Sequence, residues 1–136
     1  MSAITGPGVP KPSPWLSSAI LTESAGPTLY VSGQCGVDPA SGNFIGGTVQ
    51  DRTTQALKNV EAILKAAGLE VQDLVAATIY LSKYKEDFDS MNKAYVAFFP
   101  KGMPLPARTC IGVAALPKGT DVEITCIAAK RPTSKL

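Results

Sequence analysis

Residues 106–128 read PARTCIGVAALPKGTDVEITCIA and contain the two strands that decide the fold. The apolar runs ARTCIGVAA and DVEITCIAA are separated by LPKGT, whose Pro and Gly can form a turn. Arg108 falls in the first run and Glu123 in the second. A guanidinium that reaches a closed pocket can hold a carboxylate with two parallel hydrogen bonds. A small acid is therefore the first ligand to consider.

Both charged residues also have plainer interpretations. Arg108 could pair with a structural carboxylate or lie at the surface end of its strand, because a charge in an apolar stretch needs a partner. Alternation along DVEITCIAA places Glu123 on the face opposite Val122 and Ile124. Glu123 then faces either solvent or a subunit interface, and periodicity alone favours solvent.

The rest of the chain predicts further strands and two amphipathic helices. The expected strands are an edge strand from Leu16, a buried strand in LYVSGQCGV that ends in a tight loop at Ser32-Gly33-Gln34, and a strand in VQDLVAATIYLS, whose first few residues could begin as a turn. The expected helices cover 48–67, stopped by Gly68, and 86–99, stopped by Pro100. Apolar positions recur at helical spacing at Ala56, Leu57, Val60, Ile63, Leu64 and Ala67, and again at Phe88, Met91, Tyr95 and Phe98.

Two helices separated by one strand and flanked by hairpins predict an α+β layer, with both helices on one face of the sheet. The length fits a single domain over 1–136, with an irregular segment over about 1–15 and a tail over about 131–136. No apolar run approaches the roughly 20 residues of a membrane span, and the N-terminus lacks a secretory signal pattern. We therefore expect a soluble, intracellular protein.

The chain has no histidine, which removes Ser-His and Cys-His nucleophiles and the commonest zinc ligand. No metal site or cofactor is predicted. Three cysteines without a CxxC pair indicate buried thiols in a reducing compartment, and this applies to Cys110 in particular. A net charge of +2 with no basic run argues against nucleic acid as a partner. Ser32 and Gly33 could offer a hydroxyl and main-chain N–H groups to a ligand, although a plain turn is commoner.

Four segments, YVSGQCGVDPASG, QALKNVEAILKAAGL, FDSMNKAYVAFF and PARTCIGVAALPKGTDVEITCIA, occur in an order and spacing that resembles the RidA/YjgF family of enamine/imine deaminases. The resemblance covers nearly the whole chain. It implies a chorismate-mutase-like fold, a homotrimer with active sites between subunits, and hydrolysis of 2-imino acids such as 2-iminopropanoate and 2-iminobutanoate to 2-oxo acids and ammonia. No cofactor is implied.

By position, the resemblance implies that Arg108 binds the substrate carboxylate and that Glu123 is associated with the attacking water. Cys110 would hold that water through its backbone carbonyl. Pocket positions are implied for Ser32, Gly33 and Asn92.

Two positions depart from the family pattern. Where many members carry a Tyr, this chain has Trp15, which can form an aromatic wall or a hydrophobic anchor but donates only through its indole N–H. Gly112 stands where a larger side chain is common. Both departures concern the substrate range more than the fold.

The last residues, Ser134, Lys135 and Leu136, match a peroxisomal address. They predict a peroxisomal location, an import receptor as a partner and a eukaryotic source, with the cytosol as the alternative location. Two further functions stay open at this level. One is a non-catalytic protein that binds small carboxylates or regulates through the same cleft. The other is the endoribonuclease activity attributed to some relatives, against which the weak charge and the lack of histidine argue.

Overall fold

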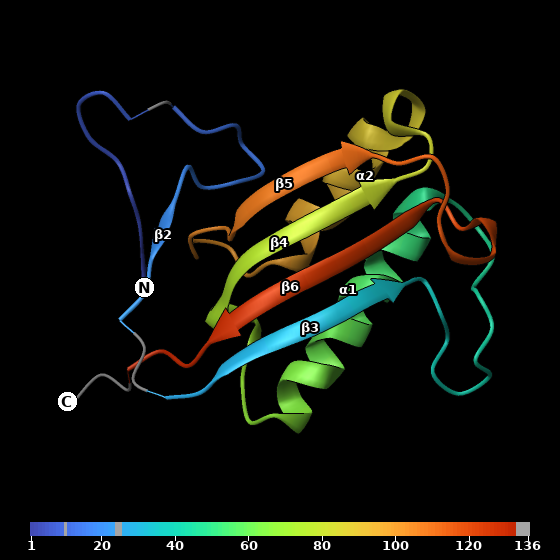
Figure 1. The fold of residues 1–136 in the computed structure, drawn as a ribbon, viewed down its shortest axis with the longest axis horizontal. Helices are drawn as coiled ribbons and strands as arrows, with labels where there is room; N and C mark the ends of the chain where they lie inside the picture. Colours follow the sequence, from blue (N-terminus) through green and yellow to red (C-terminus); the bar gives the residue numbers. More distant parts are fainter. Residues whose placement is uncertain (10, 24–25, 133–136) are drawn as a thin grey trace.

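A computed structural model describes residues 1–9, 11–23 and 26–132. Two helices cover one face of a four-stranded mixed sheet, as predicted (Figure 1). The elements are β1 Ser2–Ala3, β2 Ile20–Leu21, β3 Thr28–Cys35, α1 Val49–Ala66, the 3-10 turn η1 Val71–Asp73, β4 Leu74–Leu81, α2 Tyr84–Phe98, β5 Ala107–Gly112, the 3-10 turn η2 Pro117–Gly119 and β6 Val122–Ala129.

The sheet has the strand order β3-β6-β4-β5. Strand β6 runs antiparallel to both β3 and β4, whereas β5 runs parallel to β4. The expected hairpin between the last two strands is therefore wrong, because β6 lies between β3 and β4. The inward residues of β6 are all buried, which suits a central strand, and β5 carries the charge of Arg108, which suits an edge.

The predicted edge strand from Leu16 is also wrong for most of its length. Ile20–Leu21 pairs with Ser2–Ala3 in a separate two-stranded sheet. Only Ser17 reaches the main sheet, where it forms a single parallel bridge with Ala107. The Ser17 hydroxyl donates to the carbonyl of Leu105 at 2.5 Å and its N–H donates to the carbonyl of Pro106 at 3.5 Å, so Ser17 is held beside the start of β5.

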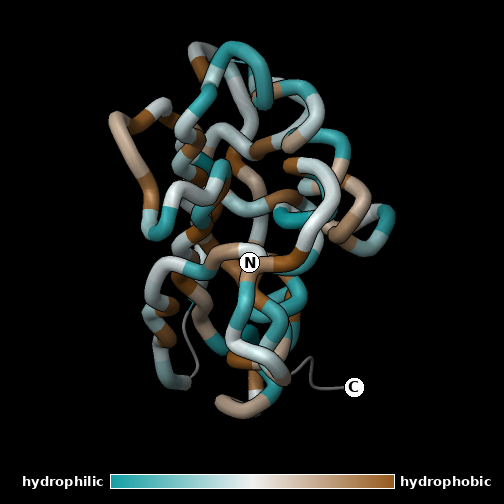
Figure 2. The backbone as a smooth tube through the Cα atoms, turned by 90° about the vertical axis from the view of Figure 1, so that its right-hand side faces the viewer, coloured by the Kyte–Doolittle hydropathy of each residue, from teal (hydrophilic) through white to brown (hydrophobic). Residues whose placement is uncertain are grey.

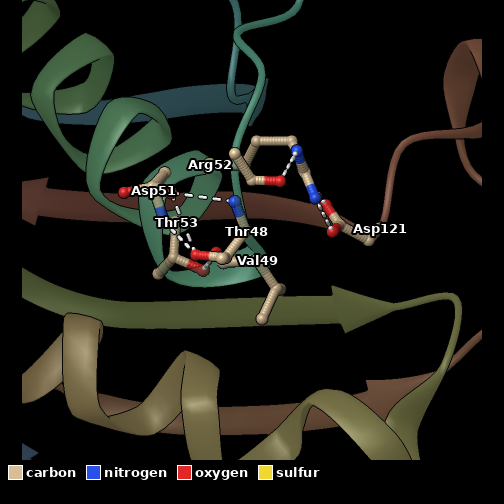
Figure 3. Close-up of polar contacts among 7 residues, drawn as sticks. Thr48, Val49, Asp51, Arg52, Thr53 and Asp121 are labelled. Atoms are coloured by element: carbon tan, nitrogen blue, oxygen red, sulfur yellow. Dashed lines mark hydrogen bonds and ion pairs between the residues drawn. The ribbon is translucent and has the colours of Figure 1, made fainter.

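Helix α1 begins where a capping box satisfies its first N–H groups. The hydroxyl of Thr48 accepts from the N–H of Asp51 at 3.3 Å, and the Asp51 carboxylate accepts from the N–H of Thr48 at 2.8 Å (Figure 3). The helix ends at Ala66, before Gly68, whose φ of 73° suits glycine. The predicted buried face holds from Ala56 to Leu64, but Ala67 is exposed because it lies beyond the helix end.

Helix α2 begins at Tyr84, two residues before the predicted start, and ends at Phe98. Met91 and Tyr95 are completely buried against the sheet, and Asn92 is 5% exposed. Hydrophobic and hydrophilic stretches alternate along the backbone in the perpendicular view of Figure 2, as amphipathic elements require. No helix among the described residues is long and apolar enough to span a bilayer.

An ion pair lies at each end of β6. At its start, Arg52 of α1 donates to both carboxylate oxygens of Asp121, at 2.8 and 2.6 Å (Figure 3). At its end, Arg131 donates to the carboxylate of Asp73 through its Nε at 2.9 Å and its main-chain N–H at 3.1 Å. The Asp73 side chain is only 1% exposed, so the pair ties the entry of β4 to the exit of β6.

Candidate active site

Arg108 lies on the edge strand β5, opposite Ala77 of β4, with its side chain on the helix-covered face of the sheet. Its Nη1 donates to Oδ1 of Asn92 on α2 at 2.7 Å. Arginine is only a donor, so this bond also fixes which end of the Asn92 amide is the oxygen. The Arg108 Cζ lies 4.8 Å from the centroid of the Tyr95 ring, within the range of a cation–π interaction.

The charge of Arg108 has no carboxylate beside it. None of the ion pairs found within residues 1–9, 11–23 and 26–132 includes Arg108, and its buried Nε has no hydrogen-bond partner. Burial lowers the pKa of Arg108, although Tyr95, Cys110 and Tyr84 act in the opposite direction. The alternative of a pairing with a structural carboxylate is not found among the described residues, where Arg108 contacts an amide instead. An anion at this point would relieve the cost of desolvating the charge.

Cys110 lies two residues along β5 from Arg108, on the same face. The carbonyl of Pro106 accepts from Ser17, and the N–H of Val113 donates to Leu81 of β4, so even-numbered residues direct their main-chain groups to the open edge. The carbonyl of Cys110 therefore points away from β4, to the open edge of the sheet. Burial raises the pKa of the Cys110 thiol and Arg108 opposes the shift, so the neutral thiol is favoured at neutral pH.

Trp15 contributes from the N-terminal segment. Its ring meets Phe88 of α2 edge-on, with the centroids 5.7 Å apart, and it lines a groove together with Asn92. Trp15 is thus both an anchor for its segment and a wall of the groove that Asn92 also lines. We call Arg108, Asn92, Cys110 and Trp15 the arginine cluster.

Glu123 lies on the opposite face of the sheet. It pairs with Cys35 of β3 and Tyr80 of β4, and its carboxylate packs so closely on Gly33 that a Cβ there would overlap Oε1. The predicted outward orientation is confirmed. We call Glu123, Gly33 and Ser32 the glutamate cluster.

Ser32 and Gly33 do not form the predicted strand-ending loop. They lie inside β3, at a register shift between Val31 and Gln34, where the irregular pairing brings the main chain against Glu123. A cavity of about 400 Å³ lies here, with Gly33, Cys35 and Glu123 in its lining. Burial, followed by the charge of Glu123, raises the pKa of Cys35 to about 11, so this thiol stays protonated at neutral pH.

The two clusters do not meet within one chain. Arg108 is on the helix side of β5, Glu123 is on the other side of β6, and β4 lies between these strands. The arginine cluster can bind an anion, and the glutamate cluster can orient water or a proton. A single substrate can use both only if they come from two copies of the chain.

Sequence reasoning missed two residues beside these clusters. Tyr95 was predicted only as core, yet its ring lies under the guanidinium; its signal was its place one helical turn after Asn92. Lys118 has a φ of 51°, uncommon without glycine, and lines the cavity of Glu123. Ser134, Lys135 and Leu136 lie outside the described residues. Among the residues that are described, no group of three or more carboxylates or thiols is placed to hold a metal ion.

Fold and site together define a class: small α+β proteins with an uncompensated arginine at the edge of a mixed sheet. The family model described as Endoribonuclease L-PSP matches residues 10–130, and the chain belongs to this family, which includes the RidA/YjgF proteins.

Curated and solved relatives agree with this assignment. The rat protein named 2-iminobutanoate/2-iminopropanoate deaminase is 44% identical over 116 residues, which is 85% of this chain and 80% of the relative. The crystal structure of the E. coli YjgF gene product superposes with a TM-score of 0.71 at 32% identity, over 96% of this chain and all of the other (100%). E. coli TdcF, solved with bound serine, gives a TM-score of 0.71 at 32% identity, over 96% and 99%.

Proposed function

We propose that the protein hydrolyses 2-imino acids, such as 2-iminopropanoate and 2-iminobutanoate, to 2-oxo acids and ammonia. The observation that carries the proposal is the half-buried Arg108, whose charge has no carboxylate beside it among the described residues. The names of relatives at 41–44% identity support the same chemistry. The chain has no histidine, so in this proposal the substrate carboxylate pairs with Arg108 and water is the nucleophile.

The proposed reaction adds one water across the C=N bond. Protonation of the imine nitrogen makes C2 electrophilic, and the water oxygen then forms a bond to C2 while the C=N π pair moves to nitrogen. One proton passes from the added water to nitrogen. The remaining O–H then loses its proton as the C–N bond breaks, which releases ammonia, leaves the 2-oxo acid and returns the proton used to activate the imine. No electrons leave the system and no cofactor is needed.

The arginine cluster would bind the carboxylate. Arg108 would neutralise it, and Asn92 would hold the guanidinium in one orientation, because its Oδ1 already accepts from Nη1. This positioning converts a random encounter into an oriented one. The outward carbonyl of Cys110 would hold the attacking water.

The glutamate cluster of a second copy would complete the site. Glu123 would orient the water, and Ser32 and Gly33 would line the pocket. We propose a homotrimer, which gives each arginine cluster one glutamate cluster. The uncovered sheet face supports assembly, because Tyr30, Ile111 and Ile127 are 76%, 43% and 37% exposed there.

The decisive test is the Arg108→Ala variant with imines generated by an L-amino-acid oxidase. We expect the acceleration of 2-oxo acid release to fall by about 10² or more, since a charge-assisted clamp is lost, while the oligomer persists. Lys58→Ala, which removes an exposed charge from α1, is the control and should keep full activity. Normal turnover by a correctly assembled Arg108→Ala protein would refute the role.

A carboxylate-binding protein without turnover is the second candidate. It is favoured by one observation: a single chain has the arginine cluster but no glutamate beside it. Calorimetric binding of pyruvate by wild type, together with no acceleration of imine hydrolysis, would support this function and exclude the deaminase.

The peroxisomal location stays a prediction. Ser134, Lys135 and Leu136 would be read by the import receptor, and a fluorescent protein fused to the N-terminus would report the location in cells. Peroxisomal signal that survives deletion of the three residues would contradict the prediction.

A further inference from the structure

A groove of about 590 Å³ runs along α2 beside the arginine cluster. Trp15 forms one wall, and the other wall is a single face of α2 with Asp89, Asn92, Lys93, Val96 and Ala97. Such a volume falls within the roughly 300–1,000 Å³ of small-molecule sites. A one- or two-carbon side chain would leave most of it empty.

Asn92 lines the groove and also contacts Arg108. Its Oδ1 is occupied by Arg108, while its Nδ2 is buried and has no hydrogen-bond partner among the described residues. The residue is only 5% exposed, so water solvates this donor poorly. A buried donor without a partner is costly, so an acceptor oxygen near Nδ2 of Asn92 would be stabilising. A carboxylate bound by Arg108 would supply such an oxygen.

The groove walls favour an uncharged, apolar group. Trp15 and Ala97 offer apolar surface, and Val96 is 40% exposed although it is a branched aliphatic residue. Asp89 and Lys93 are one helical turn apart with opposite charges, so they offset each other. The groove therefore has little net charge with which to attract a charged side chain.

The C2 atom of a 2-imino acid carries three groups. The carboxylate is directed to Arg108, and the imine must meet the water on Glu123 of another copy. The third group, the side chain of the substrate, can then extend into the groove. Resting on the proposed function, we infer that the groove receives the side chain, and that the preferred substrates are 2-imino acids with branched aliphatic or aromatic side chains, larger than 2-iminobutanoate.

Binding of product 2-oxo acids tests this without turnover. Trp15 is the single tryptophan, so its fluorescence reports the groove. We expect 4-methyl-2-oxopentanoate to change the emission and to bind at least about tenfold more tightly than pyruvate, because each buried methylene contributes roughly fourfold and the groove is partly open. Imines from leucine and phenylalanine should likewise be hydrolysed with a higher kcat/KM than the imine from alanine.

Two matched variants distinguish the contribution of the groove to binding from that of Arg108. Ala97→Trp fills the groove and should abolish the tenfold preference measured by calorimetry. Ala62→Trp makes the same change at an exposed position of α1 and should preserve the preference. Equal affinity for both acids in wild type, or a preference that survives in Ala97→Trp, overturns the inference while leaving the deaminase function intact. Failure of both acids to bind and of every imine to be hydrolysed overturns the function and the inference together.

Discussion

The guanidinium of Arg108 is held by a hydrogen bond to Asn92 and by the ring of Tyr95, and neither neighbour cancels its charge. This arrangement orients the group without neutralising it. A structural ion pair such as Arg52–Asp121 does both. The contrast separates an arginine that stabilises the fold from one that is available to an anion.

Gly33 has a role that a substitution can test. A methyl group at this position would overlap Oε1 of Glu123 and push the carboxylate out of place. We expect Gly33→Ala to lower kcat by about tenfold or more while the fold stays intact, because small displacements of a positioning group are costly. Steady-state kinetics and circular dichroism provide the measurement. Gly46→Ala is the control, since an added Cβ there meets nothing within 4 Å. Equal losses in both variants would contradict the explanation.

Cys110 is predicted to act through its carbonyl and not through its sulfur. Burial raises the pKa of its thiol, so little thiolate is present at neutral pH. Cys110→Ala keeps the carbonyl and should retain kcat within about threefold of wild type. A loss as large as that of Arg108→Ala would assign the chemistry to the thiol.

At the scale of single residues, the sequence predicts the chemical role of a side chain better than it predicts which residues that side chain contacts. Alternation placed Glu123 on the outward face correctly, because a strand has a period of two. The partner of Arg108 could not be read in the same way. Asn92 is 16 residues away, and the contact depends on how α2 lies across β5.

At the scale of elements, the position of a strand in the sheet agrees with the residues on its inward face. The inward residues of β6, Val122, Ile124, Cys126 and Ala128, are all buried, and the thiol of Cys126 has its pKa raised by burial to about 12. Helix bounds were predicted well because caps and stop signals are local: Thr48, Gly68 and Pro100 act within a turn of the helix ends. The hairpin error arose because strand order depends on contacts distant in sequence.

The Asp73–Arg131 pair predicts a pH dependence. Burial alone would raise the pKa of Asp73, but hydrogen bonds from Glu70 and Arg131, with the charge of Arg131, lower the pKa below its ordinary value. The stabilisation is therefore complete above the unfolded pKa of about 3.9 and is lost as pH falls through the folded value. We expect Asp73→Asn to lower the free energy of unfolding by about 2 kcal/mol at neutral pH.

The same comparison at low pH provides the check. The difference between wild type and Asp73→Asn, measured by urea denaturation, should shrink as pH falls from about 5 toward about 2. A difference that stays constant over this range would show that the ionised carboxylate is not what stabilises the pair.

At the scale of the whole molecule, the opposite placement of the two clusters is the main result. The sequence resemblance predicted that sites lie between subunits, and a single chain with Arg108 and Glu123 on opposite faces is compatible with that prediction. Assembly itself stays a prediction. The geometry of a partner surface cannot be read from one chain's pattern, because solvent and a second copy both accept the same outward residues.

Mixed oligomers test this prediction. Arg108→Ala and Glu123→Gln chains should each be inactive alone. When the two are co-refolded in equal amounts, about one quarter of the sites in a cyclic trimer should combine an intact arginine with an intact glutamate. We therefore expect about a quarter of wild-type kcat per site. Activity that stays at background, with mixing verified by mass spectrometry, would mean that one chain must supply both residues.

The separation of the two clusters across the sheet also has a genetic consequence. In the proposed trimer, two alleles that each damage a different cluster would restore function to each other in a cell that carries both. Two alleles that damage the same cluster would not. Loss-of-function variants at the residues of the two clusters would then sort into two complementation groups, one for each face of the β-sheet.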